Sequence, residues 1–194
     1  WDHPDFKEPL VQARVADENT GMSVTVAPDW VNAQMAPDRT WRVVLPDIPA
    51  GGLYRIETRL RTPGDVGEWA HHGDMVHHVG VGDLWVIAGQ SNSAGYGRGA
   101  VHDPPELGIH LFRNSMRWDL ASHPMNESTR TEHPENTEGA NSSHSPYLAF
   151  ARVVKRELNF PIGLVQTSLG GSGLAMWNPG EPCPHPLYEN MRRC

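Results

Sequence analysis

A short apolar segment that runs into a turn of small residues constrains the fold of this chain more than any other feature. Residues 84–88, Leu-Trp-Val-Ile-Ala, show no alternation of apolar and polar positions, which is typical of a strand buried on both faces of a sheet. The segment passes directly into Gly-Gln-Ser-Asn at residues 89–92. Because α/β proteins place ligands where parallel strands end in such turns, the pattern predicts a site at the carboxyl edge of a sheet.

A second strand and turn of the same kind lie further along the chain. Residues 162–167 are largely apolar and lead to Gly-Gly-Ser-Gly at residues 170–173. Between the two strands, Ser145 is a favourable N-cap and Pro146 a favourable first residue for a helix that ends before Pro161. The apolar stripe of this helix consists of Leu148, Phe150, Ala151, Val154 and Leu158. The order strand, helix, strand predicts a βαβ unit, in which the two strands are parallel and both turns lie at one sheet edge.

The chain before this α/β pattern alternates apolar and polar residues in short segments. These strand candidates, which are separated by Pro and Gly, are residues 10–15, 22–26, 40–45 and 53–60. Strands of this length predict an antiparallel sheet or a β-sandwich. We therefore expect a small antiparallel β-domain over residues 1–79 and an α/β domain over residues 80–194. Residues 100–145, rich in His, Pro, Asn and Glu, are expected to form a long irregular segment.

Composition excludes several kinds of partner. The formal net charge of -7 argues against nucleic acid, because phosphate binding requires clustered Lys and Arg. No apolar run approaches the roughly 18 residues of a membrane-spanning helix, so no membrane partner is expected. The two cysteines, Cys183 and Cys194, could form one disulfide or remain thiols. The adjacent histidines at 71–72 and 77–78 are expected to be solvated loop and surface residues, and no metal site is predicted.

The two predicted turns suit acyl transfer. A hydroxyl nucleophile needs a sharp, exposed turn and nearby backbone N–H groups that bind the oxyanion of the intermediate. Ser91 lies in the first turn, and the small residues of both turns allow such an arrangement. Two ordinary loops that contain Ser and Gly would have the same pattern, so the turns alone leave both interpretations open.

Two blocks of residues resemble those of a known family of hydrolases. The first is Gly-Asp-Leu-Trp at residues 82–85 with residues 89–92, and the second is residues 167–172 with Trp177 and the helix at residues 187–191. They are similar to the blocks of the sialate O-acetylesterase-like branch of the SGNH hydrolases, which includes the acetylxylan esterases of carbohydrate esterase family six. The resemblance covers about residues 80–194. It implies a flavodoxin-like three-layer α/β fold, incomplete at its C-terminus, and no metal or organic cofactor.

The resemblance also implies roles for individual residues. Ser91 matches the nucleophile, and the backbone N–H groups of Ser91 and Gly171 match the donors of the oxyanion hole. The residues that would support the two turns are Gln90, Asn92, Gly170 and Ser172. The implied reaction removes O-acetyl groups from a carbohydrate of the sialate or xylan type. The sequence leaves the compartment open, and the polysaccharide substrate class favours an extracytoplasmic or secreted location. The alternatives are a carbohydrate-binding or scaffolding protein with a degenerate SGNH fold, or a lipase-like or thioesterase member of the superfamily.

The sequence departs from the family after the second block. The family continues to a strand that ends in Gln-Gly-Glu-Ser and carries a late Asp-x-x-His, and neither follows Ser91 here. One Asp-x-x-His occurs at residues 74–77, where we expect a link into the first buried strand. His185, between two prolines, is not expected to act as the base. We expect a missing C-terminal portion of the same domain to supply His and Asp, and residues 1–194 alone to have little or no activity.

Overall fold

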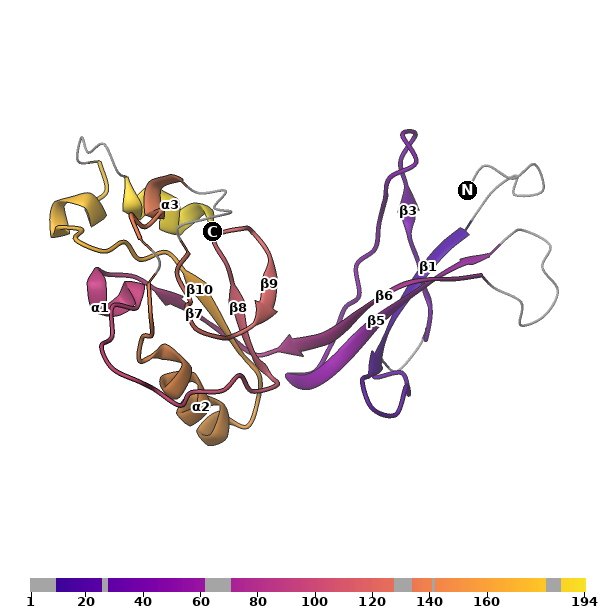
Figure 1. Ribbon diagram of the computed structural model, residues 1–194. Coiled ribbons are helices and arrows are strands. Elements are labelled where there is room, and N and C mark those ends of the chain that lie inside the picture. The colour runs from indigo at the N-terminus through magenta and orange to yellow at the C-terminus, as the bar shows by residue number, and fades with distance from the viewer. Residues whose placement is uncertain (1–9, 26–27, 62–70, 128–133, 141, 181–185) are drawn as a thin grey trace. The chain divides into compact units, whose positions relative to one another are not determined.

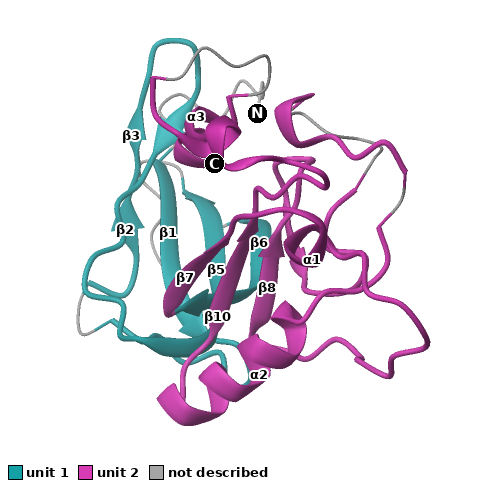
Figure 2. Cartoon of the chain, turned by 90° about the vertical axis from the view of Figure 1, so that its left-hand side faces the viewer, with its two compact units in different colours: residues 1–81 teal, residues 82–194 magenta. Residues whose placement is uncertain are grey.

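The computed structural model describes most of the chain and divides it into two compact units. The described residues are 10–25, 28–61, 71–127, 134–140, 142–180 and 186–194 (Figure 1). Residues 1–81 form one unit and residues 82–194 the other (Figure 2). The presence of several sheets together with helices confirms the mixed α/β class. No helix among the described residues has the length and apolar character needed to cross a membrane.

The first unit contains a four-stranded sheet in which every neighbouring pair is antiparallel. The strand order is β2-β1-β5-β6, formed by Val31–Asn32, Leu10–Asp17, Gly51–Arg61 and His71–Val81 (Figure 2). A separate antiparallel pair consists of β3, Gln34–Met35, and β4, Trp41–Arg42. The strands predicted at residues 10–15 and 53–60 are therefore confirmed.

Other predictions for this unit were wrong. Of the strand predicted at residues 22–26, only Ser23 forms an isolated bridge, and residues 26–27 lie outside the described part. The strand predicted at residues 40–45 is reduced to β4. Residues 74–77 belong to β6 rather than to a link. Most side chains of β6 are exposed, so pairing with β5 rather than apolar burial defines this strand, and no apolar alternation marks it.

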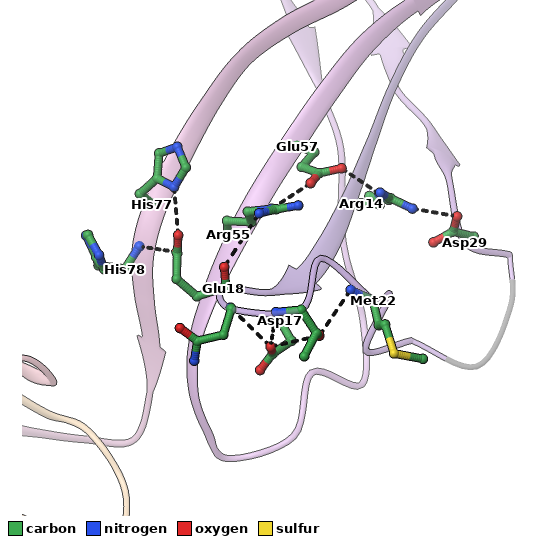
Figure 3. Close-up of polar contacts among 11 residues, drawn as sticks. Arg14, Asp17, Glu18, Met22, Asp29, Arg55, Glu57, His77 and His78 are labelled. Atoms are coloured by element: carbon green, nitrogen blue, oxygen red, sulfur yellow. Dashed lines mark hydrogen bonds and ion pairs between the residues drawn. The ribbon is translucent and has the colours of Figure 1, made fainter.

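Charged groups join the strands of this sheet (Figure 3). The buried carboxylate of Glu57 accepts hydrogen bonds from Arg14 Nε at 2.7 Å and Arg55 Nε at 2.6 Å. Burial raises the pKa of Glu57, but these hydrogen bonds outweigh that effect, and the pKa lies below its usual value. Glu18 contacts His77 Nδ1 at 2.8 Å and accepts the backbone N–H of His78 at 2.8 Å. The paired histidines thus lie in a strand and not in a loop, although their side chains are exposed as predicted.

The second unit contains the predicted parallel strands. The strand order is β7-β10-β8-β9, formed by Asp83–Ile87, Ile162–Gln166, Ile109–Phe112 and Trp118–Leu120 (Figure 1). Both β7 and β8 are parallel to β10, and β9 is antiparallel to β8. The expectation of an irregular segment over residues 100–145 was wrong in part, because it contains β8, β9 and the 3-10 helix η1, Pro134–Asn136. The four residues of β8, three of them apolar, alternate between buried and partly buried positions, and this run is too short to be recognised from the sequence.

Helix α2, Tyr147–Leu158, packs on β8 and β10. The helix ends before Pro161, as predicted, and Asn159 has the left-handed conformation that is common after a helix. The prediction that Ser145 caps the helix was wrong: Pro146 is the N-cap residue, and the Ser145 hydroxyl donates to Met125 Sδ at 3.6 Å instead. The core beneath the helix consists of Ile87, Ile109, Leu111, Ala121, Met125, Leu148, Ala151, Ile162 and Leu164. The helix predicted to begin at Leu187 is α3, Leu187–Arg193.

The prediction that the first apolar strand is buried on both faces was wrong. In β7 only Ile87 is buried, with 1% of its surface exposed, whereas Leu84 is 67% exposed. Strand β7 is the outer strand of the described sheet and pairs only with β10. By contrast, β10 lies inside the sheet, is contacted by α2, and is buried at every position. The three-layer flavodoxin-like arrangement stays a prediction.

Candidate active site

The two turns predicted to lie together do so. Strands β7 and β10 pair in parallel register, with Ile87 opposite Gln166 at their carboxyl ends. Beyond this pair, the N–H and hydroxyl of Thr167 donate to the Ile87 carbonyl at 3.0 and 2.9 Å. The Leu169 N–H then donates to the Gly89 carbonyl at 3.0 Å. These bonds continue the strand pairing into the turns and hold the segment before Ser91 against the second glycine turn.

Ser91 is the first residue of the short helix α1, Ser91–Ala94, which follows β7 directly. Gly89 allows the sharp turn between β7 and α1, because its φ of 126° is rarely adopted by residues with a side chain. A Cβ at Gly89 would also lie 2.7 Å from Ser93 Oγ. Gln90 is the N-cap residue, and its carbonyl accepts the Ala94 N–H at 2.8 Å. The turn therefore presents Ser91, which is partly exposed, at the edge of the sheet.

Two backbone donors near the turns are available for a ligand. Among the described residues, none accepts a hydrogen bond from the N–H of Ser91 or of Gly171. The first N–H groups of a helix have no partner within the helix, which accounts for Ser91. Gly171 has a φ of 72°, and apart from Gly171 and its two chain neighbours, no atom lies within 4 Å of the position that a Cβ would occupy. Such unpaired donors are what an oxyanion hole requires.

The other residues expected to support the turns differ in what they contact. The Gly170 N–H donates to Glu138 Oε1 at 2.7 Å. Ser172 Oγ accepts the indole N–H of Trp177 at 3.1 Å, so Trp177, in the 3-10 helix η2, Leu174–Trp177, is tied to the second turn. The Asn92 side chain is exposed and has no hydrogen-bond partner among the described residues. Backbone bonds, and not this amide, hold the first turn.

Sequence reasoning missed a buried polar network behind the second turn. Its centre is Glu138, which accepts hydrogen bonds from Gly170 and from the side chains of Asn126 and Tyr96. Asn126 also accepts a hydrogen bond from Asn114 at 2.5 Å. The Glu and Asn content of residues 100–145 was visible, but no spacing within that segment indicates which of its polar side chains are buried together. Contacts with residues far away in the sequence decide which of these side chains are buried.

The pH at which the Tyr96 hydroxyl ionises reports on its hydrogen bond to Glu138 in this network. The hydroxyl donates to Glu138 Oε2 at 2.7 Å, and this hydrogen bond is the main cause that raises the pKa of Tyr96 to about 12, from the ordinary 10.0. We expect ultraviolet titration to show one of the four tyrosines ionising near pH 12, and Tyr96→Phe to remove that transition.

The raised pKa of Tyr96 determines how the free energy of unfolding changes with pH. The neutral phenol is favoured in the folded state, so its contribution is fully present below pH 10.0 and is lost as the pH rises toward 12. The free energy of unfolding should therefore fall more steeply over this range in the wild type than in Tyr96→Phe. Ionisation of all four tyrosines near pH 10.0 would contradict the Glu138 contact.

The histidine side chains that form hydrogen bonds within the described part of the chain contact residues other than Ser91. His123 Nε2 lies 2.9 Å from Asp103 Oδ2, but Asp103 is also paired with Arg152 of α2, so this His–Asp pair is engaged with the helix. His185 and Cys183 lie outside the described residues. No group of three or more His, Cys, Asp or Glu side chains within the described ranges could hold a metal ion.

A parallel sheet with a serine turn and a glycine turn at one edge is an arrangement that hydrolases use, and comparison with known proteins narrows the class. The chain belongs to a family of carbohydrate esterases, because residues 81–193, more than half of its length, match the model of that family. The family is the one described as carbohydrate esterase, sialic acid-specific acetylesterase. Its recognition from the two blocks at residues 82–92 and 167–172 is confirmed.

The individual relatives share about a quarter of their residues with this chain over the aligned regions. The sialate O-acetylesterase of Mus musculus is 26% identical over 161 residues, which cover 76% of this chain and 29% of that protein. The sialate O-acetylesterase of Rattus norvegicus is 26% identical over 165 residues, with the same coverage of both chains. This chain therefore spans 29% of the length of these curated relatives.

Two solved structures are similar to parts of the chain. A protein from Arabidopsis thaliana has 28% identity and a TM-score of 0.44, covering 57% of this chain and 48% of its own. A carbohydrate acetylesterase from Xanthomonas citri has 19% identity and a TM-score of 0.41, covering 97% of this chain and 43% of its own. Family membership rests on the match over residues 81–193.

Proposed function

We propose that the protein is a serine esterase that removes O-acetyl groups from a carbohydrate, with Ser91 as the nucleophile. The observation that carries this proposal is that the turns containing Ser91 and Gly171 lie together at the carboxyl ends of the parallel strands β7 and β10, and that neither N–H has an acceptor among the described residues. Membership of the esterase family supports the same chemistry. The family description and the mouse and rat relatives favour an acetylated sialic acid as the substrate, with acetylated xylan as the other candidate.

The proposed reaction has two steps. In the first, Ser91 Oγ attacks the acetyl carbonyl carbon while a histidine takes the hydroxyl proton, and the N–H groups of Ser91 and Gly171 stabilise the oxyanion. The bond to the sugar oxygen then breaks, and the histidine returns the proton to that oxygen. In the second step, the same histidine takes a proton from a water molecule that attacks the acetyl-serine ester. The bond to Ser91 Oγ then breaks, the histidine returns the proton to that oxygen, and acetate is released.

We propose that the histidine and its aspartate come from a part of the protein outside residues 1–194. Two observations support this. The described histidines make no hydrogen bond to Ser91, and the chain spans only 29% of the length of the curated relatives. A nucleophile without its base retains only the catalysis that binding and oxyanion stabilisation provide.

A paired assay tests the function. The full-length protein and a chain limited to residues 1–194 are each mixed with p-nitrophenyl acetate, and acetate release is also measured from O-acetylated sialic acid and acetylated xylan. We expect turnover by the full-length protein and no burst of p-nitrophenol from residues 1–194. A burst from the shorter chain at a rate typical of a complete triad would contradict the external base.

The alternative function is carbohydrate binding without turnover. It is favoured by the observation that none of the described histidines is hydrogen-bonded to Ser91. A full-length protein that binds an acetylated sugar in calorimetry but releases no acetate would establish this alternative. A preference for long acyl chains in a series of p-nitrophenyl esters would instead indicate a lipase-like or thioesterase activity.

A further inference from the structure

A buried carboxylate lies directly behind the second turn. Glu138 has 5% of its surface exposed, and its oxygens accept three hydrogen bonds. Oε1 accepts the Gly170 N–H at 2.7 Å and Asn126 Nδ2 at 2.8 Å, and Oε2 accepts the Tyr96 hydroxyl at 2.7 Å. All three partners are donors, so a carboxylate, which only accepts, satisfies them together.

These hydrogen bonds join the two segments that form the site. Tyr96 follows α1, the helix that begins at Ser91, and its N–H donates to the Ser91 carbonyl at 3.0 Å. Gly170 directly precedes Gly171 in the second turn. Asn126 reinforces the connection, because its amide also donates to the Ser168 carbonyl at 3.0 Å. One side chain therefore connects the serine turn with the glycine turn.

The packing around this carboxylate is close. A Cβ at Gly170 would lie 2.8 Å from Glu138 Oε2 and 2.8 Å from Tyr96 Cε2. A side chain at this position would require the Glu138 carboxylate or the Tyr96 ring to shift. Burying a carboxylate is unfavourable, and Glu138 has no ion-pair partner among the described residues.

We infer that Glu138 is a positioning residue, which holds Gly170 so that the N–H of Gly171 is aimed at the oxyanion. This inference rests on the proposed function and adds a residue to it. The Gly171 N–H belongs to the peptide that Gly170 begins, and Gly171 itself has a φ of 72° and empty space beside its Cα. The bond from the Gly170 N–H to Glu138 thus restrains a segment that glycine would otherwise leave free to move.

Two substitutions separate the reach of this side chain from its charge. Glu138→Asp keeps the carboxylate but withdraws it by one methylene from Gly170. Glu138→Gln keeps an oxygen within reach of Gly170 and Asn126 but removes the charge. A misplacement of about 1 Å can lower a rate roughly 100-fold, so we expect kcat of Glu138→Asp to be about 10- to 100-fold below that of Glu138→Gln. KM should change little, because the displaced donor acts on the oxyanion and not on the bound ester.

The experiment measures kcat and KM of the full-length protein and both variants with p-nitrophenyl acetate. A kcat for Glu138→Asp at least about tenfold below that of Glu138→Gln supports the inference, and a smaller difference overturns it. Amide hydrogen exchange provides a second measurement, in which Gly170 should exchange faster in Glu138→Asp than in Glu138→Gln. Equal exchange at Gly170 would also overturn the inference.

The same assay separates this inference from the proposed function. If Ser91→Ala abolishes turnover while the two Glu138 variants have equal kcat, the esterase stands and the positioning role does not. If Ser91→Ala retains wild-type turnover, the proposed function fails and this inference fails with it. Circular dichroism of each variant establishes that it is folded before its rate is compared.

Discussion

Replacement of Ser91 by alanine in the full-length protein is expected to lower kcat for acetyl esters by roughly 10⁴-fold or more. The substitution removes the oxygen that would form the acetyl-enzyme, so only catalysis by binding and by the oxyanion donors remains. The fold should be unaffected, because the described residues contain no hydrogen-bond partner of Ser91 Oγ and the backbone bonds from Gly95 and Tyr96 to the Ser91 carbonyl are kept. Steady-state release of p-nitrophenol and circular dichroism provide the two measurements.

Ser93 offers a matched control for this substitution. It lies in the same helix, and its Oγ is 2.8 Å from the Tyr147 hydroxyl, so Ser93→Ala removes one partly buried hydrogen bond. That loss corresponds to about 1 kcal/mol of stability and leaves the proposed nucleophile in place. We expect Ser93→Ala to retain most of the turnover. Wild-type activity in Ser91→Ala, or an equal loss in both variants, would contradict the assignment of Ser91.

The largest effect on stability is expected from Leu164→Ala. Leu164 lies in β10, pairs with Trp85 of β7 and Leu111 of β8, and has 0% of its surface exposed. Truncation removes buried apolar contacts and leaves a cavity, because both neighbouring strands keep the surrounding backbone in place. The free energy of unfolding should fall by about 2–5 kcal/mol, which urea unfolding of the full-length protein can measure.

Leu174→Ala is the control for the stability measurement. Leu174, in η2, is 80% exposed, so the same change of side chain removes little buried surface. We expect an effect within about 0.5 kcal/mol. Similar losses in the two variants would show that Leu164 is not in the core of the folded protein.

The parallel strands and their turns could be predicted because the signals are local. An apolar run of five residues before Gly-Gln-Ser-Asn, and a second before Gly-Gly-Ser-Gly, indicate strands that end in small-residue turns. The helix between them then requires parallel pairing, which the register of β7 and β10 shows. The same blocks were sufficient for recognising the esterase family.

Burial along the first strand could not be predicted from the same residues. The apolar sequence at residues 84–88 is compatible with an inner strand, and only the sheet order places β7 at the outside of the described sheet. Strand β6 was missed for the opposite reason, because an exposed strand held by pairing with β5 has no apolar pattern. Both errors concern neighbours in space, about which a local pattern carries no information.

The sequence by itself determined that a serine turn and a glycine turn each follow an apolar strand, because each turn consists of residues adjacent in the chain, at 89–92 and 170–173. Only the tertiary structure decided what holds these turns in place. Glu138 reaches Gly170 across 32 residues of sequence, and Tyr96 reaches Glu138 across 42. Contacts between segments so far apart depend on the packing of the whole unit, and glycine turns without side chains of their own must be positioned by such contacts.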